Sequence, residues 1–405
     1  MTTSELHEFG FFEYISPDEL KDVVLKYEFP QYIYSRKIIS QSYLNLRNNF
    51  DSNYEIFYAQ KSNPNHEILK HINSLGIGCD TASKGEIVSA LNAGFNPNKI
   101  MFTGPSKRPD EIEFAIKNNL MSINVESVQE LKAVNKIARD LGKIQDILVR
   151  INPIYEAGET TRIIGGTGIS KFGIDIEQID EFMIVIKNLK NVSLNGIHIF
   201  NSSQILDWRN VYSNTKNVID TALSLSREYS FNLRHIDLGG GFGIPYDAVE
   251  TDIDITELGE SLSELINRSD YRSLLDGVKL IYEPGRYLSG KSGIYLTKIL
   301  YTKSSRGKDI LLIDGGIHHL IRPALIGTTH PIFNLTAFYE KRNVKNNYMI
   351  AGPLCTSLDT FGENIELAES RPGDILAVLN AGAYGYTESM PNFLSHSPAV
   401  EKFLD

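Results

Sequence analysis

The chain has 405 residues, of which 42% are hydrophobic, so it can bury a large core and we expect two domains. Its formal net charge of -10 argues against a surface for nucleic acid or anionic membrane, because such surfaces need clustered Lys and Arg. The sequence begins without a signal-peptide pattern and has no apolar run long enough to span a membrane, so we expect a cytoplasmic protein.

Short strand patterns dominate the first 290 residues. Two aromatic-rich runs in residues 1–35 flank a predicted helix that begins at Pro17, and a helical pattern follows at 40–50. From there, apolar strand patterns alternate with helical ones. The eight predicted strands are 55–60, 76–79, 100–103, 122–125, 147–152, 195–199, 234–238 and 279–282.

Eight strand-and-helix units over about 250 residues predict a (β/α)8 barrel of the TIM type. Periodicity alone would also permit an open, doubly wound sheet. The polar residues favour the barrel, because they follow the ends of different strands, and those ends converge on one face of a barrel. These positions are Lys61, Asp80, Arg150, 201–204, 239–241 and Glu283.

The pattern changes after about residue 290. Strand patterns at 293–300, 309–314, 348–351 and 374–380 follow one another without long helices, which predicts a mostly antiparallel β domain. We therefore expect a barrel over 36–288 and a β domain over 289–405, with 1–35 packing on the latter. The glycine-rich segment 158–171 is predicted to be a mobile loop near the barrel mouth.

Several strand-end residues together suit a phosphorylated cofactor. The Gly239–Gly241 triplet exposes backbone N–H groups and Ser203 adds a hydroxyl, which would suit a phosphate. Glycine triplets also form plain tight turns, and a lysine at a strand end is more often a surface residue. Lys61, however, lies between an apolar strand and a turn, and an aldehyde cofactor held as an imine would use all these parts. Glu283 would keep the ring nitrogen protonated.

The sequence resembles the ornithine/diaminopimelate decarboxylase family, the pyridoxal-phosphate enzymes of fold type III, over nearly its full length. Eight collinear motifs are far more specific than any one of them. They are YAQKSNPN at 58–65, CDTASKGEI at 79–87, LVRINP at 148–153, SKFGI at 170–174, DLGGGFGIPY at 237–246, EPGRYL at 283–288, GPLCTSLD at 352–359 and AGAYG at 381–385.

The resemblance implies a cofactor, pyridoxal 5'-phosphate, and a role for each matching residue. Lys61 would form the imine, with Asp80 and Arg150 near the ring and the lysine, and Glu283 would pair with the pyridine nitrogen. The phosphate would be bound by Ser203, Gly240, Gly241, the backbone around Gly285 and Arg286, and the hydroxyl of Tyr384.

The resemblance also implies an obligate homodimer with composite sites. In this family Cys355 and Asp359 come from the partner subunit, and the cysteine is the expected proton donor to the carbanion. Without that context Cys355 would be interpreted as a buried inert thiol, which is how we interpret Cys79. Neither cysteine has metal-ligand spacing, and no metal site is predicted. Where the family has a ring-stacking histidine this chain has Phe200, which we expect to stack, with His198 structural.

Glu283 favours decarboxylation, because related racemases place an arginine against the pyridine nitrogen. The substrate site departs from diaminopimelate decarboxylase: Arg286 and Arg322 persist, but Ile326 replaces a tyrosine and Thr356 replaces a glutamate. A distal ammonium would lose its carboxylate there, which is unfavourable when buried.

The motifs around Arg322, Thr356 and Tyr384 resemble those of specialised biosynthetic decarboxylases. We therefore expect an amino acid tethered to a carrier protein or conjugated, bound by Arg286, Arg322 and Thr356. Diaminopimelate decarboxylase is the alternative, followed by an ornithine or lysine decarboxylase and by an amino-acid racemase. Non-catalytic relatives that only bind partners typically lose the lysine or the cysteine motif, and both are intact here.

Overall fold

The computed structural model describes residues 11–24, 26, 28–154, 169–247 and 249–404. They form two compact units. The first consists of Tyr43–Gly243 and Asp252–Gly285, and the second takes the described residues of Met1–Ser42, Ile244–Thr251 and Arg286–Asp405. Residues 158–168 of the glycine-rich segment, predicted to be a mobile loop, lie outside the described residues.

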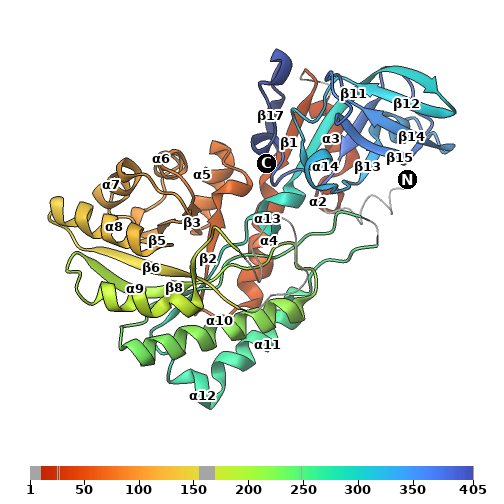
Figure 1. Cartoon of the computed structure of the whole chain (residues 1–405). Coiled ribbons are helices and arrows are strands. Elements are labelled where there is room, and N and C mark those ends of the chain that lie inside the picture. Colours follow the sequence, from red (N-terminus) through yellow and green to blue (C-terminus); the bar gives the residue numbers. More distant parts are fainter. Residues whose placement is uncertain (1–10, 25, 27, 155–168, 248, 405) are drawn as a thin grey trace. The chain divides into compact units, whose positions relative to one another are not determined.

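Parallel strands close the first unit into an eight-stranded barrel (Figure 1). The sheet has no open edge among these strands, because β2 pairs with β10 and β5 pairs with β6. The predicted barrel is therefore confirmed. The strands are β2 (Tyr54–Ala59), β3 (Gly78–Thr81), β4 (Ile100–Phe102), β5 (Ser122–Val125), β6 (Gln145–Asn152), β8 (Val192–His198), β9 (His235–Asp237) and β10 (Lys279–Tyr282), with the short β7 (Ile174–Asp175) beside β6.

Helices lie outside the barrel strands in Figure 1. They are α5 (His66–Ser74), α6 (Lys84–Asn92), α7 (Pro109–Lys117), α8 (Val128–Asp140), α9 (Ile179–Ile186), α10 (Trp208–Tyr229), α11 (Ile255–Asn267) and α12 (Ser269–Arg272), with 3-10 turns at Gln60–Ser62, Pro97–Lys99 and Ile176–Gln178. Side-chain caps define several of their starts: Ser83 accepts from the Glu86 N–H before α6, and Ser127 accepts from the Glu130 N–H before α8. Such caps satisfy N–H groups that have no partner within the helix.

Strand register brings polar residues to one level at the carboxyl ends of the strands. Arg150 on β6 is the register partner of His198 on β8, and His198 is the partner of Asp237 on β9. Side chains of register partners point to the same face of a sheet, so these three form a neighbouring row. Deeper in the barrel, Phe57, Met101 and Ile281 form a buried apolar cluster.

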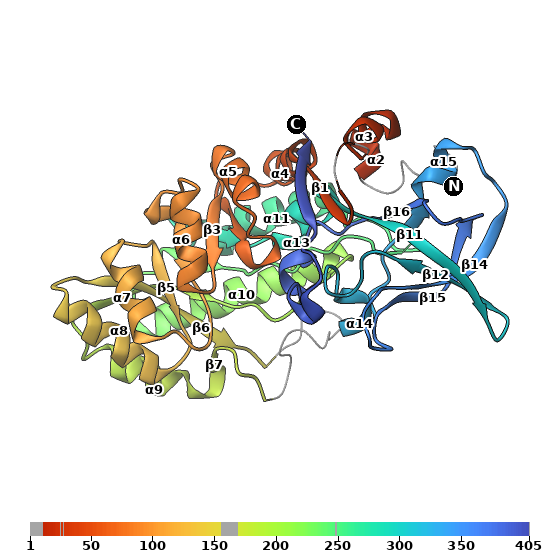
Figure 2. The same ribbon diagram turned by 90° about the horizontal axis from the view of Figure 1, so that it is seen from above.

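The second unit is built on an eight-stranded, mostly antiparallel sheet (Figure 2). Its strand order is β13-β16-β11-β12-β14-β15, and β1 pairs with β11 and with β17. The strands are β1 (Gln31–Ser35), β11 (Gly293–Ser305), β12 (Lys308–Ile313), β13 (Ile332–Asn334), β14 (Lys345–Ala351), β15 (Thr360–Ala368), β16 (Ile375–Val378) and β17 (Val400–Leu404). Among the strands that the structure describes in this sheet, only β12–β14 and β1–β17 are parallel pairs.

Short helices accompany this sheet. They are α2 (Phe11–Tyr14), α3 (Pro17–Val24), α13 (Gly285–Ser289), α14 (Arg322–Ile326) and α15 (Leu335–Tyr339), with α4 (Arg36–Asn49) after β1 and 3-10 turns at Gly290–Ser292, Tyr386–Glu388 and Phe393–Ser395. Phe11 and Phe12 of α2 pack into the core of this unit with Ile33, Ile294 and Leu296 of the sheet. None of the described helices has the length and apolar character needed to cross a bilayer.

Candidate active site

Lys61 is tied to a buried acid at the end of β2. It stands in the 3-10 turn that follows the strand, and its Nζ lies 2.9 Å from Oδ2 of Asp80 on β3. The lysine side chain is 38% exposed, whereas that of Asp80 is 1% exposed. Asp80 Oδ1 is buried and accepts no hydrogen bond from the described residues. The ion pair therefore presents a partly accessible amine on a fixed, buried carboxylate.

His198, Asp237 and Glu283 form a buried acid cluster at the same ends of the strands. Their ligand atoms all lie within 4.8 Å of one another, a spacing that a metal ion could also use. Nε2 of His198 is 3.9 Å from Oδ2 of Asp237 and 3.9 Å from Oε2 of Glu283. Asn124 Nδ2 lies 3.2 Å from Nδ1 of His198, so the tautomer with hydrogen on Nε2 faces the acids.

Burial sets the protonation of this cluster. It raises the pKa of Glu283 well above its ordinary value, and the neighbouring carboxyl of Asp237 raises it further. Burial also raises the pKa of Asp237, against the opposing effect of the Gly239 N–H. Atoms of the two carboxyl groups lie within 4.8 Å of each other, so ionisation of one disfavours ionisation of the other. Burial lowers the pKa of His198, and Arg150 lowers it further, so the imidazole is neutral.

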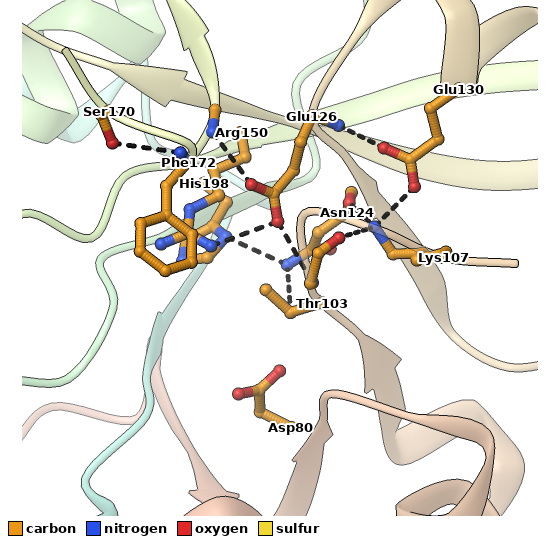
Figure 3. A network of polar contacts seen from close by, with 12 residues as sticks. Asp80, Thr103, Lys107, Asn124, Glu126, Glu130, Arg150, Ser170, Phe172 and His198 are labelled. Atoms are coloured by element: carbon orange, nitrogen blue, oxygen red, sulfur yellow. Dashed lines mark hydrogen bonds and ion pairs between the residues drawn. The ribbon is translucent and has the colours of Figure 1, made fainter. Parts of the chain in front are cut away.

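Glu126 anchors Arg150 beside this cluster (Figure 3). Its Oε1 lies 3.2 Å from NH1 of Arg150, and its two oxygens also accept from the N–H groups of Gly104 and Gly173. The Arg150 guanidinium stands 4.6 Å from the ring centre of Phe172. A charged hydrogen bond and a cation–π contact thereby hold the Arg150 side chain in place.

A second buried ion pair stabilises the loop ends next to Glu126. Lys107 Nζ contacts Oε1 of Glu130 at 2.7 Å and also donates to the carbonyls of Gly104 and Asn124. The other oxygen of Glu130 accepts from the Glu126 N–H at 2.7 Å. All three Lys107 donors are used, so this lysine is a structural residue.

The Gly239–Gly241 turn packs closely against the neighbouring backbone. A Cβ at Gly240 would lie 2.4 Å from the Glu283 carbonyl oxygen, and Gly241 has a φ of 98°. Both positions therefore need glycine. The turn is joined to the segment after β8, because the Ile205 N–H donates to the Gly241 carbonyl. The hydroxyl of Ser202 is buried there without a partner among the described residues.

Ser203 and Phe200 lie on the same post-β8 segment. Ser203 is half-buried, in contrast to its buried neighbour Ser202. Phe200 is also half-buried, and its ring lies against Gly239, where a Cβ would come within 2.6 Å of it. Gly285 likewise fits closely, since a Cβ there would lie 2.9 Å from Cβ of Ser62.

The second unit holds what we call the arginine cluster: Tyr246, Arg286, Arg322, His330, Tyr384 and Glu388. Arg286 NH1 donates to the Tyr246 hydroxyl at 2.8 Å, and its guanidinium stands 4.8 Å from the ring centre of Tyr384. Arg322 lies 5.7 and 5.5 Å from the ring centres of Tyr246 and Tyr384. Its NH1 is 3.3 Å from Oε2 of Glu388. Both arginines are buried.

Asp359 organises the turn that carries Cys355. Its two oxygens accept from the Ile317 and Leu354 N–H groups, each at 2.7 Å. Gly316 and Gly352 face the same carboxylate, where a Cβ would come within 2.5 and 2.3 Å of an oxygen. Burial raises the pKa of Asp359, and these two N–H donors oppose the rise. Cys355 is exposed at the tip of the turn, with Thr356 beside it.

The structure thus divides the predicted site residues between its two units. The barrel unit brings together Lys61, Asp80, Arg150, Phe200, Ser203, Gly240, Gly241, Glu283 and Gly285, and the second unit holds Arg286, Arg322, Tyr384, Cys355, Thr356 and Asp359. Sequence reasoning missed Asp237, Glu126 and Glu388. Glu126 follows β5 directly, so the strand-end rule that selected Lys61 and Glu283 would have found it. The Arg322–Glu388 pair has no comparable local signal.

Known proteins resemble the chain along most of its length. The family described as "Pyridoxal-dependent decarboxylase, pyridoxal binding domain" matches residues 36–290. The L-glutamyl-[BtrI acyl-carrier protein] decarboxylase of Niallia circulans is 31% identical over 95% of this chain and 90% of its own length. The diaminopimelate decarboxylase of Aquifex aeolicus is 32% identical over 93% and 87%. The solved structure of the Helicobacter pylori diaminopimelate decarboxylase complexed with L-lysine has a TM-score of 0.86 at 30% identity and covers 95% of this chain and 94% of that one.

Proposed function

This chain belongs to the family of pyridoxal-dependent decarboxylases, and we propose that its substrate is an amino acid tethered to a carrier protein or conjugated to a second molecule. The family makes the chain a carboxy-lyase that uses pyridoxal 5'-phosphate. We infer which residues hold the cofactor and what the substrate is.

Unpartnered polar atoms in the barrel unit fit the two polar ends of this cofactor. Oε1 of Glu283 is buried without a partner and can accept from a protonated ring nitrogen. At the other end, the unpartnered hydroxyl of Ser202 and the Gly240–Gly241 backbone can donate to a phosphate. Lys61 supplies an amine for the aldehyde. Ser203 and Phe200 are the other residues of this unit that we propose to contact the cofactor.

When bound, pyridoxal phosphate supplies an electron sink for the charge left at Cα as carbon dioxide departs. The protein's contribution is to hold protons at fixed atoms. Glu283, as an anion, would keep the ring nitrogen protonated, because a buried carboxylate strongly favours an adjacent positive charge. Asp237 would hold the remaining proton of the pair and donate it in a hydrogen bond to Glu283, so that the cluster carries a single negative charge. Asp80 would keep the Lys61 amine oriented.

Reprotonation after loss of carbon dioxide needs a donor, and we assign it to Cys355 of a second subunit in a homodimer. The exposed position of this thiol within one chain is what a residue that serves another subunit would have. Asp359 fixes the turn through two N–H groups and so acts as a positioning residue. The backbone around Gly285 and Arg286 and the hydroxyl of Tyr384 would contact the cofactor phosphate.

The substrate assignment rests on Thr356. A substrate with a distal ammonium needs a carboxylate opposite it, and Thr356 beside Cys355 offers a hydroxyl that already accepts from the Leu358 N–H. Arg286 and Arg322 suit an anion or another acceptor-rich group. A relative at 31% identity is named for a glutamyl group carried on an acyl-carrier protein, which is a substrate of this kind.

Carbon dioxide release from matched substrates tests the assignment. Holoenzyme would be assayed with free diaminopimelate, with a glutamyl group on an acyl-carrier protein, and with conjugated amino acids. We expect kcat/KM to be at least about a hundredfold higher for one of the tethered or conjugated substrates than for diaminopimelate, equivalent to about 2.7 kcal/mol of transition-state stabilisation. Efficient turnover of free diaminopimelate would instead make the chain a diaminopimelate decarboxylase, which is the name of relatives at similar identity.

A further inference from the structure

Glu126 connects several strand ends of the barrel unit through one carboxylate (Figure 3). It follows β5 directly, and its side chain is 2% exposed. One oxygen lies 3.2 Å from NH1 of Arg150 on β6 and accepts from the Gly104 N–H, after β4, at 3.1 Å. The other oxygen accepts from the Gly173 N–H, just before β7, at 2.9 Å. The carboxylate therefore fixes the Arg150 guanidinium relative to two neighbouring loops.

The charges around Glu126 balance one another. Glu126 pairs with Arg150, and Glu130, which accepts from the Glu126 N–H, pairs with Lys107 at 2.7 Å. Two carboxylates and two cations leave these four residues without net charge when all are ionised. Loss of the Glu126 charge would leave the buried Arg150 as an uncompensated cation, which is unfavourable unless another anion takes its place.

The acid cluster of His198, Asp237 and Glu283 lies in register with Arg150. Arg150 is the register partner of His198, and His198 is the partner of Asp237, so the Cα atoms of Arg150 and Asp237 are about 10 Å apart with side chains on one face. At an effective dielectric constant of about 20, a full charge at that distance changes a carboxyl pKa by about 1. Burial has the largest effect, lowering the pKa of His198 and raising that of Asp237, and Arg150 lowers both.

We propose that Glu126 is a positioning residue for the Asp237–Glu283 pair: by binding Arg150 it keeps the guanidinium charge from stabilising both carboxylates, so the pair retains one proton. The two carboxyl groups are buried and approach to within 4.8 Å, so a second negative charge there is unfavourable unless a cation compensates it. The consequence for the reaction rests on the proposed function, in which Glu283 faces the cofactor ring and Asp237 holds the proton.

Other charged groups near the pair have different contacts. Asp80 Oδ2 is 2.9 Å from the Lys61 amine, and these two charges act on Glu283 in opposite directions. Within the described ranges, Glu126 is the carboxylate in ion-pair contact with Arg150. The charged groups that act on the pair or on His198 are Lys61, Asp80, Lys107 and Arg150.

Infrared spectroscopy can follow the proton directly, because the C=O stretch of a protonated carboxyl group is separate from the bands of a carboxylate. The full-length, cofactor-free protein would be titrated, since the cofactor adds charges of its own. The band of the pair is the one that disappears in Asp237→Asn/Glu283→Gln. In the unaltered protein we expect it to persist well above the ordinary pKa of an aspartate, because burial raises the pKa of Asp237.

Glu126→Gln should lower the pH midpoint of this band by about 1, a tenfold loss of proton affinity. Glu126→Gln/Arg150→Met removes both charges and should return the midpoint to within about 0.3 of the unaltered value. A midpoint that stays low in the double variant would mean that Glu126 acts on the pair directly, which would overturn the positioning role.

Arg150→Gln tests the same coupling in the opposite direction, and it decides the matter if Glu126→Gln does not fold. It leaves the Glu126 carboxylate buried without its cation, so more protonated carboxyl should be present at alkaline pH than in the unaltered protein. An unchanged band in Arg150→Gln would overturn the proposal.

The matched control is Glu113→Gln, a surface glutamate of the same unit that pairs with Lys117, and its midpoint should be unaltered. An unchanged midpoint in Glu126→Gln, or an equal fall in the control, would overturn the proposal. So would the absence of the band from the unaltered protein. The titration involves no substrate, so a failure to release carbon dioxide from tethered substrates would count against the proposed function alone.

Discussion

The carboxyl groups of Asp237 and Glu283 approach to within 4.8 Å of each other inside the barrel, where both side chains are buried. Neighbouring anions in such a place are strongly unfavourable, so the pair keeps a proton. In our account Glu283 faces the cofactor ring and Asp237 carries that proton. Substituting each residue in turn separates these roles.

Asp237→Asn should flatten the pH dependence of stability of the cofactor-free protein. The folded-state pKa of Asp237 is raised above its ordinary value of 3.8, so the folded state binds more protons than the unfolded state. Stability is therefore fully present below about pH 4 and falls as pH rises through the raised pKa. Between pH 5 and pH 8 we expect the unaltered protein to lose about 1 kcal/mol or more relative to Asp237→Asn, measured by denaturant unfolding. Asp110→Asn, at an exposed acid, should keep the full slope, and parallel slopes for both variants would contradict a shared proton.

Glu283→Gln should lower kcat while leaving cofactor binding largely intact. A neutral amide cannot keep the ring nitrogen protonated, so we expect kcat to fall by about a hundredfold to a thousandfold, with the cofactor dissociation constant changing by less than about tenfold. The control is Glu55→Gln, a surface glutamate on β2 that pairs with Lys279. An unchanged kcat in Glu283→Gln would remove this residue from the mechanism.

Gly240→Ala should weaken cofactor binding through the backbone. The added Cβ would lie 2.4 Å from the Glu283 carbonyl oxygen, so the turn must shift away from its present path. We expect the cofactor dissociation constant to rise by about tenfold to a hundredfold, measured by fluorescence titration. Gly85→Ala is the matched control, because its Cβ would meet nothing closer than 3.6 Å. Equal affinities for the two variants would place the phosphate elsewhere.

Mixed subunits test the composite site. Lys61→Ala and Cys355→Ala should each be nearly inactive, since one removes the amine and the other the proton donor. If each site takes its lysine from one subunit and its cysteine from the other, random reassembly gives half heterodimers with one intact site each. We then expect recovery of about one quarter of the unaltered activity after equal mixing. No recovery from a mixture that demonstrably exchanges subunits would mean that both residues serve the same site or that Cys355 has another role.

The local pattern of the sequence predicted the barrel because each strand is short, apolar and followed by a helix. The eight predicted strands all correspond to barrel strands, with ends that differ by a few residues. In the second unit, 293–300, 309–314, 348–351 and 374–380 correspond to β11, β12, β14 and β16. Strand β15 was missed because Gly362 and the exposed residues Glu363, Asn364 and Glu366 interrupt the apolar alternation.

Long-range register explains what the sequence could not reveal about the site. Lys61, Asp80 and Glu283 could be selected because each follows its own strand. That His198 lies between Asn124, Asp237 and Glu283 depends on the relative shift of β5, β8, β9 and β10, which no local pattern encodes. His198, which we expect to be structural, is buried beside these two acids.

The Arg322–Glu388 pair is a further example of a contact without a local signal. The two residues are 66 positions apart in the sequence, and neither lies in a regular strand. Sequence comparison of motifs drew attention to Arg322 and Thr356, whereas the carboxylate that neutralises Arg322 became evident only from the packing of the second unit.

Mapping the lysine that carries the cofactor is the most direct test of the account. Holoenzyme would be reduced with borohydride, which converts an imine into a stable secondary amine, and digested for mass spectrometry. The account predicts that the pyridoxyl group is found on the peptide that contains Lys61. Labelling of another lysine, or a holoenzyme that acquires no label at Lys61, would contradict it.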